Sequence, residues 1–529
     1  MTTEHDTTAP PRVKRSEVWA VSLLTAAFTA LVAIWGVLTP LYDAPDEPLH
    51  VNSILRLAEG GGWPEPGEAE LERMLPAARA EADLPKTDRH TFAELRESRP
   101  GYHGVDQMTQ HPPLYYGYGA AALSLIDYTE IRADLVLVYL RWVGALLALP
   151  LPFLAWDSVR RLTRSPRAAI VAAAALLAVP QLAHIMGAVS NDGLAILTSS
   201  LTVWLSVRVM TGRARWGTIV ALGVSLALAL LTKGTTLPLV PFVALVVLFW
   251  PCDLSWRARV LRTGVTMAIG FLGGLWWARN LLVYGKLQPD GLQYPSEPWP
   301  AGTGPDLHRF SDAAWHNLTG SFWGRFGWLT HSLPELLTDV LSVICIFVVV
   351  AFAFRRGTGR ARALALASLP LLLFAALMVT AWSGYDRTQR LAGLQGRYFF
   401  PAIIALIALS AIAWRRLAGA RSRSVSAAFI VTFAAIAVFG LYVECSAVYG
   451  SLPDLMGRVP LRVPWLLVLL AVGATLLAAA VGASLHVVRS VDVARRAAPS
   501  GQSPDSAGAD AANRASHAEG DAASREASA

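Results

Sequence analysis

Apolar runs of about 20 residues, the length that crosses a bilayer, recur along most of this chain. The first begins near Trp19 and the last ends near residue 487. The chain has 529 residues, of which 54% are hydrophobic, and its mean hydropathy is +0.43. These values exclude an ordinary soluble domain. The sequence therefore predicts an all-α fold, a polytopic transmembrane helical bundle.

The apolar runs number twelve, or thirteen if a shorter piece at residues 113–126 also crosses. The expected spans are residues 19–41, 135–156, 168–188, 193–210, 217–232, 236–251, 264–283, 336–354, 363–382, 398–414, 425–446 and 463–487. If 113–126 stays on the outer side, every Arg-rich loop falls on the cytoplasmic side, as the positive-inside bias requires. We therefore expect about twelve spans, with 113–126 as a juxtamembrane or re-entrant helix on the outer face.

Three parts of the chain follow from this topology. Residues 1–17 are expected to be a cytoplasmic N-terminal tail, and residues 18–490 a polytopic membrane domain. That domain has two large outer loops, at about 42–133 and 285–335. Residues 491–529 have the Ala, Ser and Asp content of a disordered C-terminal tail.

The net charge of +7 resides in short inter-span loops, so it does not indicate a nucleic-acid partner. The three cysteines, Cys252, Cys345 and Cys445, lie in or beside spans and far apart in sequence. They indicate neither a disulfide framework nor a zinc site.

The stretch after the first span concentrates acids beside a histidine. Asp43, Asp46, Glu47 and His50 are spaced i, i+3, i+4 and i+7, so a helix starting here would present all four on one face. Such a group can bind a divalent cation or take a proton from a hydroxyl. The alternative is a solvated helix cap beside a membrane span.

A second acid, Asp192, follows Asn191 at the outer boundary of a later span. Alone, this pair is equally consistent with a helix cap. On the same side of the membrane as the first group, Asp192 is expected to share a metal ion or an acceptor hydroxyl with Asp46 and Glu47.

Three cationic side chains, Lys233, Arg279 and Arg397, lie at outer membrane edges, against the usual basic-inside preference. Each one singly has the alternative of snorkelling to lipid phosphate. Together they indicate an anion site, because Arg recognises phosphate in a bidentate manner and Lys acts as a point charge.

Ionisable residues within the expected spans gather towards the outer ends; they are Arg141, His184, Lys233, Arg279 and Glu444. Such residues are costly in lipid and usually mark a functional site. A transporter would place them near the midplane between repeated halves, and the sequence shows no internal repeat. The expected chemistry is therefore at the outer surface.

Aromatic residues accompany the two outer loops. His111 begins an extended Pro-rich piece, where it is a metal-ligand or substrate-contact candidate, and Tyr115 and Tyr116 follow as an expected membrane-interface belt. The second loop carries Trp299, Trp315, Trp323 and Trp328. They are interpreted as a surface that stacks on sugar rings or lies on the bilayer.

These motifs, in their order and sidedness, resemble the glycosyltransferase C superfamily, polytopic enzymes that use polyprenyl-phosphate sugars. The motifs that carry the resemblance are Pro45-Asp46-Glu47-Pro48 with His50, His111-Pro112-Pro113-Leu114-Tyr115-Tyr116, Arg141, Asn191-Asp192, Arg279-Asn280 with Tyr284-Gly285, and Gln395-Gly396-Arg397-Tyr398. The chain is similar to the protein mannosyltransferase group and its bacterial relatives, the aminoarabinose transferases. The Pro-Asp-Glu-Pro and Gln-Gly-Arg-Tyr motifs especially resemble an actinobacterial membrane family of unassigned function. The similarity covers about residues 19–414.

The resemblance implies a plasma-membrane enzyme that transfers a sugar from a polyprenyl-phosphate donor to an envelope glycan or lipid on the outer face, with inversion. Its implied catalytic residues are Asp46, Glu47, Asp43 and Asp192, with Asp46 or Glu47 as general base. Its implied substrate-binding residues are His50, His111, Arg141, Lys233, Arg279, Asn280, Arg397 and Tyr398. Asp46, Glu47 and Asp192 are also the implied ligands if a divalent metal takes part. The chain lacks the C-terminal lumenal domain of the protein mannosyltransferases, which disfavours a protein acceptor.

Two non-enzymatic alternatives stay open. One is a transporter or flippase for lipid-linked glycans, and the other is an envelope assembly protein that keeps the fold without catalysis. Release of polyprenyl phosphate by the purified protein separates the transferase from both.

Overall fold

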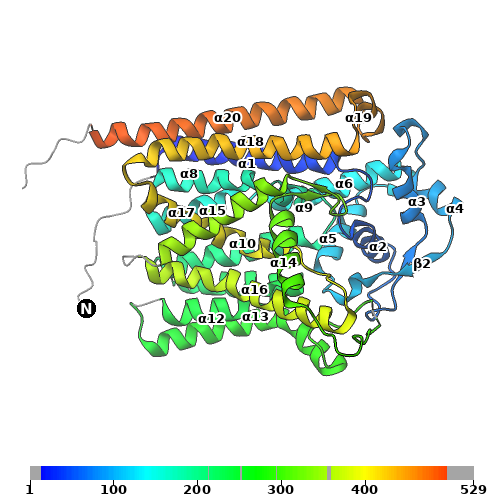
Figure 1. The fold of residues 1–529 in the computed structure, drawn as a ribbon, viewed down its shortest axis with the longest axis horizontal. Coiled ribbons are helices and arrows are strands. Elements are labelled where there is room, and N and C mark those ends of the chain that lie inside the picture. The colour runs from blue at the N-terminus through cyan, green and yellow to red at the C-terminus, as the bar shows by residue number, and fades with distance from the viewer. Residues whose placement is uncertain (1–12, 213, 251–252, 293–294, 354–358, 497–529) are drawn as a thin grey trace, which may run out of the picture. The chain divides into compact units, whose positions relative to one another are not determined.

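The computed structural model describes residues 13–496, apart from 213, 251–252, 293–294 and 354–358. Within these residues, helices make up most of the structure and four short strands occur in the outer loops. In Figure 1 the long helices lie side by side, and the short helices of the first outer loop gather at one end of them. The predicted all-α bundle is thus confirmed.

The long helices and the helix pairs form the bundle. They are α1 (Arg15–Leu38), α6 (Ala133–Ala145), α7 (Leu151–Thr163), α8 (Pro166–Ala174), α9 (Pro180–Met186), α10 (Asn191–Met210), α11 (Trp216–Leu230), α12 (Leu239–Phe249), α13 (Trp256–Tyr284), α15 (Glu335–Ala353), α16 (Arg360–Thr388), α17 (Ile403–Ala418), α18 (Ser422–Val448) and α20 (Val463–Arg496). Short 3₁₀ turns adjoin them at η5 (Leu146–Ala148), η6 (Ala175–Ala178), η7 (Gly234–Thr236), η8 (Gly396–Ala402) and η9 (Gly419–Arg421).

The outer loops carry the remaining elements. The helices are α2 (Glu47–Ala58), α3 (Met74–Ala80), α4 (Phe92–Ser98), α5 (Leu114–Leu123), α14 (Leu307–Trp323) and α19 (Leu452–Arg458), with the 3₁₀ turns η1 (Glu81–Asp83), η2 (Lys86–Asp88), η3 (Gln107–Gln110) and η4 (Tyr128–Glu130). Strand β1 (Glu70–Glu72) pairs antiparallel with β2 (Tyr102–Val105). Strand β3 (Arg325–Phe326) pairs antiparallel with β4 (His331–Ser332), with Phe326 opposite His331.

Among the described residues, seven helical stretches are long and apolar enough to cross a membrane, or up to eight if the bent pair Pro166–Ala178 and Pro180–Met186 is one span. Each of the twelve expected spans falls on a helix or helix pair of the bundle, and the number that cross stays a prediction. Helix α5 has ten residues. It is therefore about 15 Å long, half the thickness of the hydrocarbon core, and is too short to cross alone.

The expected part boundaries fall inside helices. Helix α1 begins at Arg15, before the expected border at residue 18, and α20 continues to Arg496, beyond the expected border at 490. Most of the two expected tails, residues 1–12 and 497–529, lies outside the described residues.

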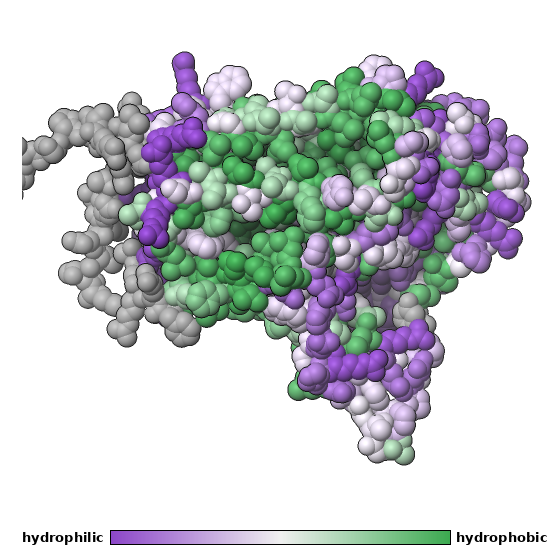
Figure 2. Space-filling view, turned by 45° about the horizontal axis from the view of Figure 1, so that its top comes forward, coloured by the Kyte–Doolittle hydropathy of each residue, from purple (hydrophilic) through white to green (hydrophobic). Residues whose placement is uncertain are grey.

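The face of the bundle seen in Figure 2 is apolar over the long helices and hydrophilic towards both of their ends. Large apolar side chains such as Phe271 and Leu272 of α13, Phe347 of α15 and Val379 of α16 are more than half exposed. A protein in water would bury side chains of this size. The exposed apolar face is therefore suited to lipid.

The local sequence between α8 and α10 explains the position of Asp192, at the start of α10. Pro180 interrupts the helical hydrogen bonding, and α8–η6 and α9 meet at a bend of 68°. Helix α9 then runs close beside α1, where a Cβ on Gly187 would lie 2.7 Å from the Val32 carbonyl oxygen. The hydroxyl of Ser190 caps α10 by accepting a hydrogen bond from the Asp192 amide, at 3.2 Å.

Candidate active site

The backbone at the start of α2 separates two adjacent acids. Asp46 caps the helix in the left-handed region, with φ 63° and ψ 6°, a conformation that Asp tolerates better than most residues. Because the helix begins only at Glu47, the prediction that Asp43, Asp46, Glu47 and His50 share one helical face is wrong. The acids point to different partners.

Glu47 is committed to a buried ion pair. Both of its carboxylate oxygens accept from Arg141, at 2.8 Å from Nε and 2.6 Å from Nη2, and both side chains are fully buried. One oxygen also accepts from the Val189 amide at 2.9 Å. The rest of the guanidinium donates to the carbonyls of Gly36, Thr39 and Pro40. This pair ties α1, α2 and α6 together and leaves Glu47 no free oxygen.

Asp46 instead joins a chain of alternating charges. Its carboxylate accepts from Nη2 of Arg397 at 2.9 Å. Nη1 of the same arginine lies 3.6 Å from Asp192, whose other oxygen accepts from Lys233 at 2.7 Å. The four side chains come from the α2, α10, η7 and η8 regions, so residues far apart in sequence meet here.

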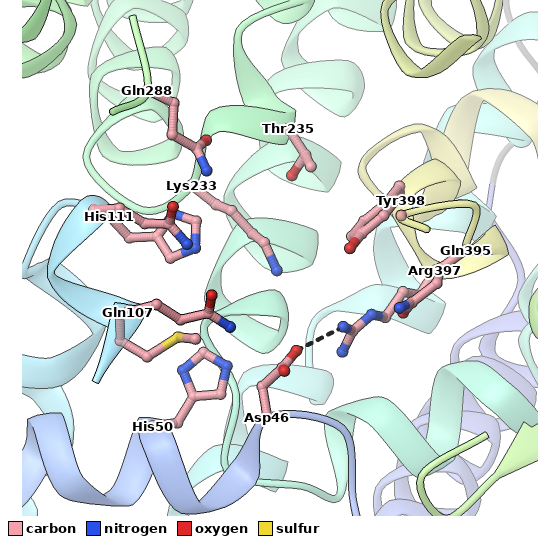
Figure 3. A pocket seen from close by; sticks show the side chains of 13 residues that line it. Asp46, His50, Gln107, His111, Lys233, Thr235, Gln288, Gln395, Arg397 and Tyr398 are labelled. Atoms are coloured by element: carbon pink, nitrogen blue, oxygen red, sulfur yellow. Dashed lines mark hydrogen bonds and ion pairs between the residues drawn. The ribbon is translucent and has the colours of Figure 1, made fainter. Parts of the chain in front are cut away.

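A cavity of about 420 Å³ opens against this chain of charges. Figure 3 shows Asp46, Lys233 and Arg397 directed into it from three sides. The ring of Tyr398 faces both cations, at 5.9 Å from Lys233 Nζ and 5.6 Å from Arg397 Cζ. The Arg397 guanidinium is buried, and its Nε has no hydrogen-bond partner among the described residues. One N–H donor of this guanidinium is therefore unsatisfied within the described residues.

The histidines of the cavity are buried and electrically neutral. Desolvation by burial lowers the pKa of His50 to about 3, against the opposing effect of Asp46. Burial likewise lowers the pKa of His111 to about 3, and its Nδ1 has no hydrogen-bond partner in the part of the chain that is described. His50 Nδ1 lies 3.1 Å from the Tyr116 hydroxyl, and the two rings are stacked.

Asp46 remains a carboxylate in this setting. Burial would raise its pKa, but the charge of Arg397, the hydrogen bond from Arg397 and the charge of Lys233 together lower the pKa below its ordinary value. The group is therefore ionised at neutral pH.

One aromatic prediction is wrong, and a second is wrong for one residue. Tyr115 and Tyr116 are 3% and 0% exposed, so they support His50 from inside and form no membrane-interface belt. Of the four tryptophans of the second loop, Trp323 is buried and does not belong to an exposed surface. For Trp299, Trp315 and Trp328, the surface that stacks on sugar rings or lies on the bilayer stays a prediction.

Arg279 and Asn280 lie away from the cavity wall. Arg279 is exposed and pairs with exposed Glu65 at 2.8 Å. Asn280 is buried and donates to the Leu287 carbonyl at 3.1 Å, next to Gln288, which does line the cavity. Of the three cations expected at the anion site, Lys233 and Arg397 line the cavity and Arg279 does not.

The three acids expected to bind a metal do not fit one. Asp46 faces Arg397, Asp192 faces Lys233 and Arg397, and Glu47 is held by Arg141. Each carboxylate thus already has a cationic partner, and a divalent ion would have to displace these partners. We derive no catalytic step through a metal at these residues.

Several cavity residues were not anticipated from the sequence: Gln107, Met108, Thr235, Gln288 and Gly393. The only sequence feature that could have indicated some of them is their proximity to residues of the motifs. Gln107 lies four residues before His111, and Thr235 lies two after Lys233. Neutral amides have no sequence pattern that separates them from surface residues.

The sequence matches one family model, described as "Predicted membrane protein (DUF2142)", over residues 29–407. None of the curated proteins matches it.

Three solved structures are similar in fold. ArnT from Cupriavidus metallidurans bound to undecaprenyl phosphate is 16% identical over 89% of this chain and 76% of its own, with a TM-score of 0.45. The Archaeoglobus fulgidus oligosaccharyltransferase in the apo form is 13% identical over 81% of this chain and 56% of its own, with a TM-score of 0.42. AglB from the same organism, with an inhibitory peptide and a dolichol-phosphate, is 12% identical over 81% and 55%, with a TM-score of 0.40. The chain spans little more than half of these archaeal enzymes.

Proposed function

The chain belongs to the DUF2142 family of predicted membrane proteins, and we propose that it is a membrane glycosyltransferase. It takes a sugar from a polyprenyl-phosphate donor and transfers it to a hydroxyl of an envelope glycan or lipid. The reaction takes place at the outer face of the plasma membrane and inverts the anomeric centre.

One observation carries this proposal: an ionised carboxylate, Asp46, and two cations, Lys233 and Arg397, line the same cavity. A sugar transfer from a phosphate donor needs these two kinds of group, a proton acceptor for the attacking hydroxyl and positive charge for the leaving phosphate. The motif resemblance supports the same roles.

The pair between Asp46 and Arg397 couples donor binding to base strength. A donor phosphate in the cavity attracts the guanidinium of Arg397, which lines it. As Arg397 turns its charge to the phosphate, the interaction that lowers the pKa of Asp46 weakens. The carboxylate therefore becomes a better base when the donor is in place.

The chemical step is a single displacement. Asp46 takes the proton of the acceptor hydroxyl as its oxygen forms a bond to the anomeric carbon. The bond between that carbon and the phosphate oxygen breaks, and its electron pair stays on the phosphate. Arg397 and Lys233 stabilise the charge that develops there.

The position of the cations suits a lipid-linked donor. Lys233 precedes η7, between two apolar helices, and Arg397 lies in η8 at the start of α17. Both are at helix ends, where a phosphate head group at the membrane surface is within reach while its polyprenyl chain stays in lipid. The basic inter-span loops lie at the opposite helix ends, which supports an outward-facing site.

The test uses purified protein in nanodiscs that contain a polyprenyl-phosphate sugar and an envelope acceptor extract. We expect acceptor-dependent release of polyprenyl phosphate, which is lost in Lys233→Met. Exposed Arg279→Met is the matched control, because it also removes a cation from the outer edge and should retain release. Transport of the donor without release would instead identify a flippase. Neither activity, with the donor still bound, would identify an assembly protein.

A further inference from the structure

A second polar cluster lies apart from the cavity residues. It consists of Asp43 from the loop before α2, His331 of β4 and Glu444 of α18. One ligand atom from each residue lies within 4.8 Å of the other two. None of the three lines the cavity, and the proposed sugar transfer uses none of them.

The atoms of Asp43, His331 and Glu444 that could ligate a metal lie close to one another. His331 Nδ1 lies 3.0 Å from one oxygen of Glu444. One carboxylate oxygen of Asp43, Oδ1, accepts a hydrogen bond from Arg79 at 3.3 Å. The other, Oδ2, faces the turn between β3 and β4. One imidazole nitrogen and two carboxylate oxygens supply three of the four ligands of a tetrahedral metal site.

Gly327 provides the space beside these donors. It has φ of +60°, and a Cβ built there would lie 2.7 Å from Asp43 Oδ2, 3.1 Å from Thr330 Oγ1 and 3.3 Å from His331 Nδ1. An ordinary side chain is therefore excluded at this position. The glycine leaves a small hollow bounded by two oxygens and a nitrogen.

Glu444 supplies an independent sign of a missing ligand. Its side chain is fully buried, and its second oxygen, Oε1, has no hydrogen-bond partner in the described ranges. A buried carboxylate with an unused oxygen is costly unless a cation or donor satisfies it. The unsatisfied carboxylate lies beside the imidazole of His331, in the same cluster as Asp43.

We propose that Asp43, His331 and Glu444 bind a divalent cation of the zinc type. A nitrogen donor with two carboxylates suits zinc better than calcium or magnesium, which prefer oxygen ligands alone. The Thr330 hydroxyl or a water completes the shell. The metal replaces the proton that His331 Nδ1 shares with Glu444, so binding releases that proton.

The ion has a structural consequence for the candidate active site. Asp43 precedes Asp46 by three residues, and His331 and Glu444 lie on the second outer loop and on α18. A shared metal therefore fixes the strained start of α2 to two other segments. This site does not depend on the proposed sugar transfer, because it requires only metal binding.

The experiment measures zinc directly. The full chain is purified in detergent, treated with a chelator, titrated with zinc alone and desalted, and its zinc content and Tm are measured. We expect about one zinc per chain and a rise in Tm. His331→Ala should weaken zinc binding roughly 100-fold or more, since even loss of a supporting partner costs 10- to 100-fold. His316→Ala is the control, because His316 pairs with an acid on the exposed surface of α14 and should leave zinc binding unchanged.

A ligand replacement keeps the test decisive if His331→Ala does not fold. His331→Cys retains a metal ligand, so with Co²⁺ it should show a thiolate-to-cobalt charge-transfer band that the unsubstituted chain lacks. Zinc content that is equal in the unsubstituted chain and His331→Ala would overturn the proposal. Absence of the cobalt band in a folded His331→Cys protein would overturn it as well.

Discussion

Arg141 holds both oxygens of the Glu47 carboxylate, at 2.8 and 2.6 Å, where neither side chain is exposed. This pair distinguishes Glu47 from its neighbour Asp46, which pairs with Arg397 beside the cavity instead. Glu47 is therefore held in a structural ion pair, and we propose Asp46 as the base.

Glu47→Gln should destabilise the protein strongly. The amide cannot balance the Arg141 charge, and breaking a buried ion pair from one side costs about 3–5 kcal/mol. The expected result is a lower Tm in detergent and less protein in the membrane. The control is Asp290→Asn, which removes an exposed pair with Lys286 and should change stability by less than about 0.5 kcal/mol. Equal losses in the two variants would argue against a structural role for Glu47.

Arg397→Lys should weaken use of the donor although it keeps the charge. Lysine cannot span Asp46 and Asp192 and also present a donor to phosphate. Loss of a hydrogen bond to a charged group costs about 1.5–3 kcal/mol, so kcat/KM for the donor should fall roughly 10- to 150-fold. Arg279→Lys, on the exposed surface, should leave kcat/KM for the donor close to that of the unsubstituted protein. An unchanged kcat/KM in Arg397→Lys would limit this residue to balancing the charges of Asp46 and Asp192.

The pH dependence should show no histidine step. Because the pKa of Asp46 is lowered, its carboxylate is present above that pKa and is lost only as the pH falls through it, below the ordinary range of an Asp carboxyl group. His50 and His111, each with a pKa lowered to about 3, stay neutral from pH 8 to pH 5. We therefore expect kcat/KM to be flat in this range with respect to these groups.

The kcat profile should differ from the kcat/KM profile. In the complex, donor phosphate draws Arg397 away from Asp46, so the acid limb of kcat should lie at higher pH. An acid limb of kcat/KM near pH 6.5 would indicate a histidine base instead.

The orientation can be tested by thiol labelling from outside intact cells, in a chain whose three native cysteines are replaced. A cysteine at exposed Leu125, after α5, should react with an impermeant reagent. A cysteine at exposed Asp253, before α13, should react only after permeabilisation. The reverse pattern would place the cavity on the cytoplasmic side.

The bundle was predictable because each span's signal is local. An apolar run such as 425–446 predicts its helix without knowledge of any partner, and α18 covers it. The positive-inside bias then predicted that Asp46, Asp192, Lys233 and Arg397 lie on the same side of the membrane. The sequence does not determine where on that face a side chain lies, which is why Arg279 was expected at the anion site and lies beside Glu65.

The choice between Asp46 and Glu47 required tertiary structure. It depends on a left-handed backbone at Asp46 and on Arg141, a partner 94 residues from Glu47. The cluster of Asp43, His331 and Glu444 joins three distant segments, so no spacing rule could have found it. Local periodicity carries no information about such contacts.

Turnover by Asp46→Asn tests the central claim most directly. The amide keeps the shape of the side chain and can still accept a hydrogen bond from Arg397, but it cannot take the acceptor's proton. At matched amounts of purified protein, release of polyprenyl phosphate should fall about 10²- to 10⁴-fold, with donor binding and Tm close to the unsubstituted values. Near-normal release by folded Asp46→Asn would contradict the assignment of Asp46 as the base.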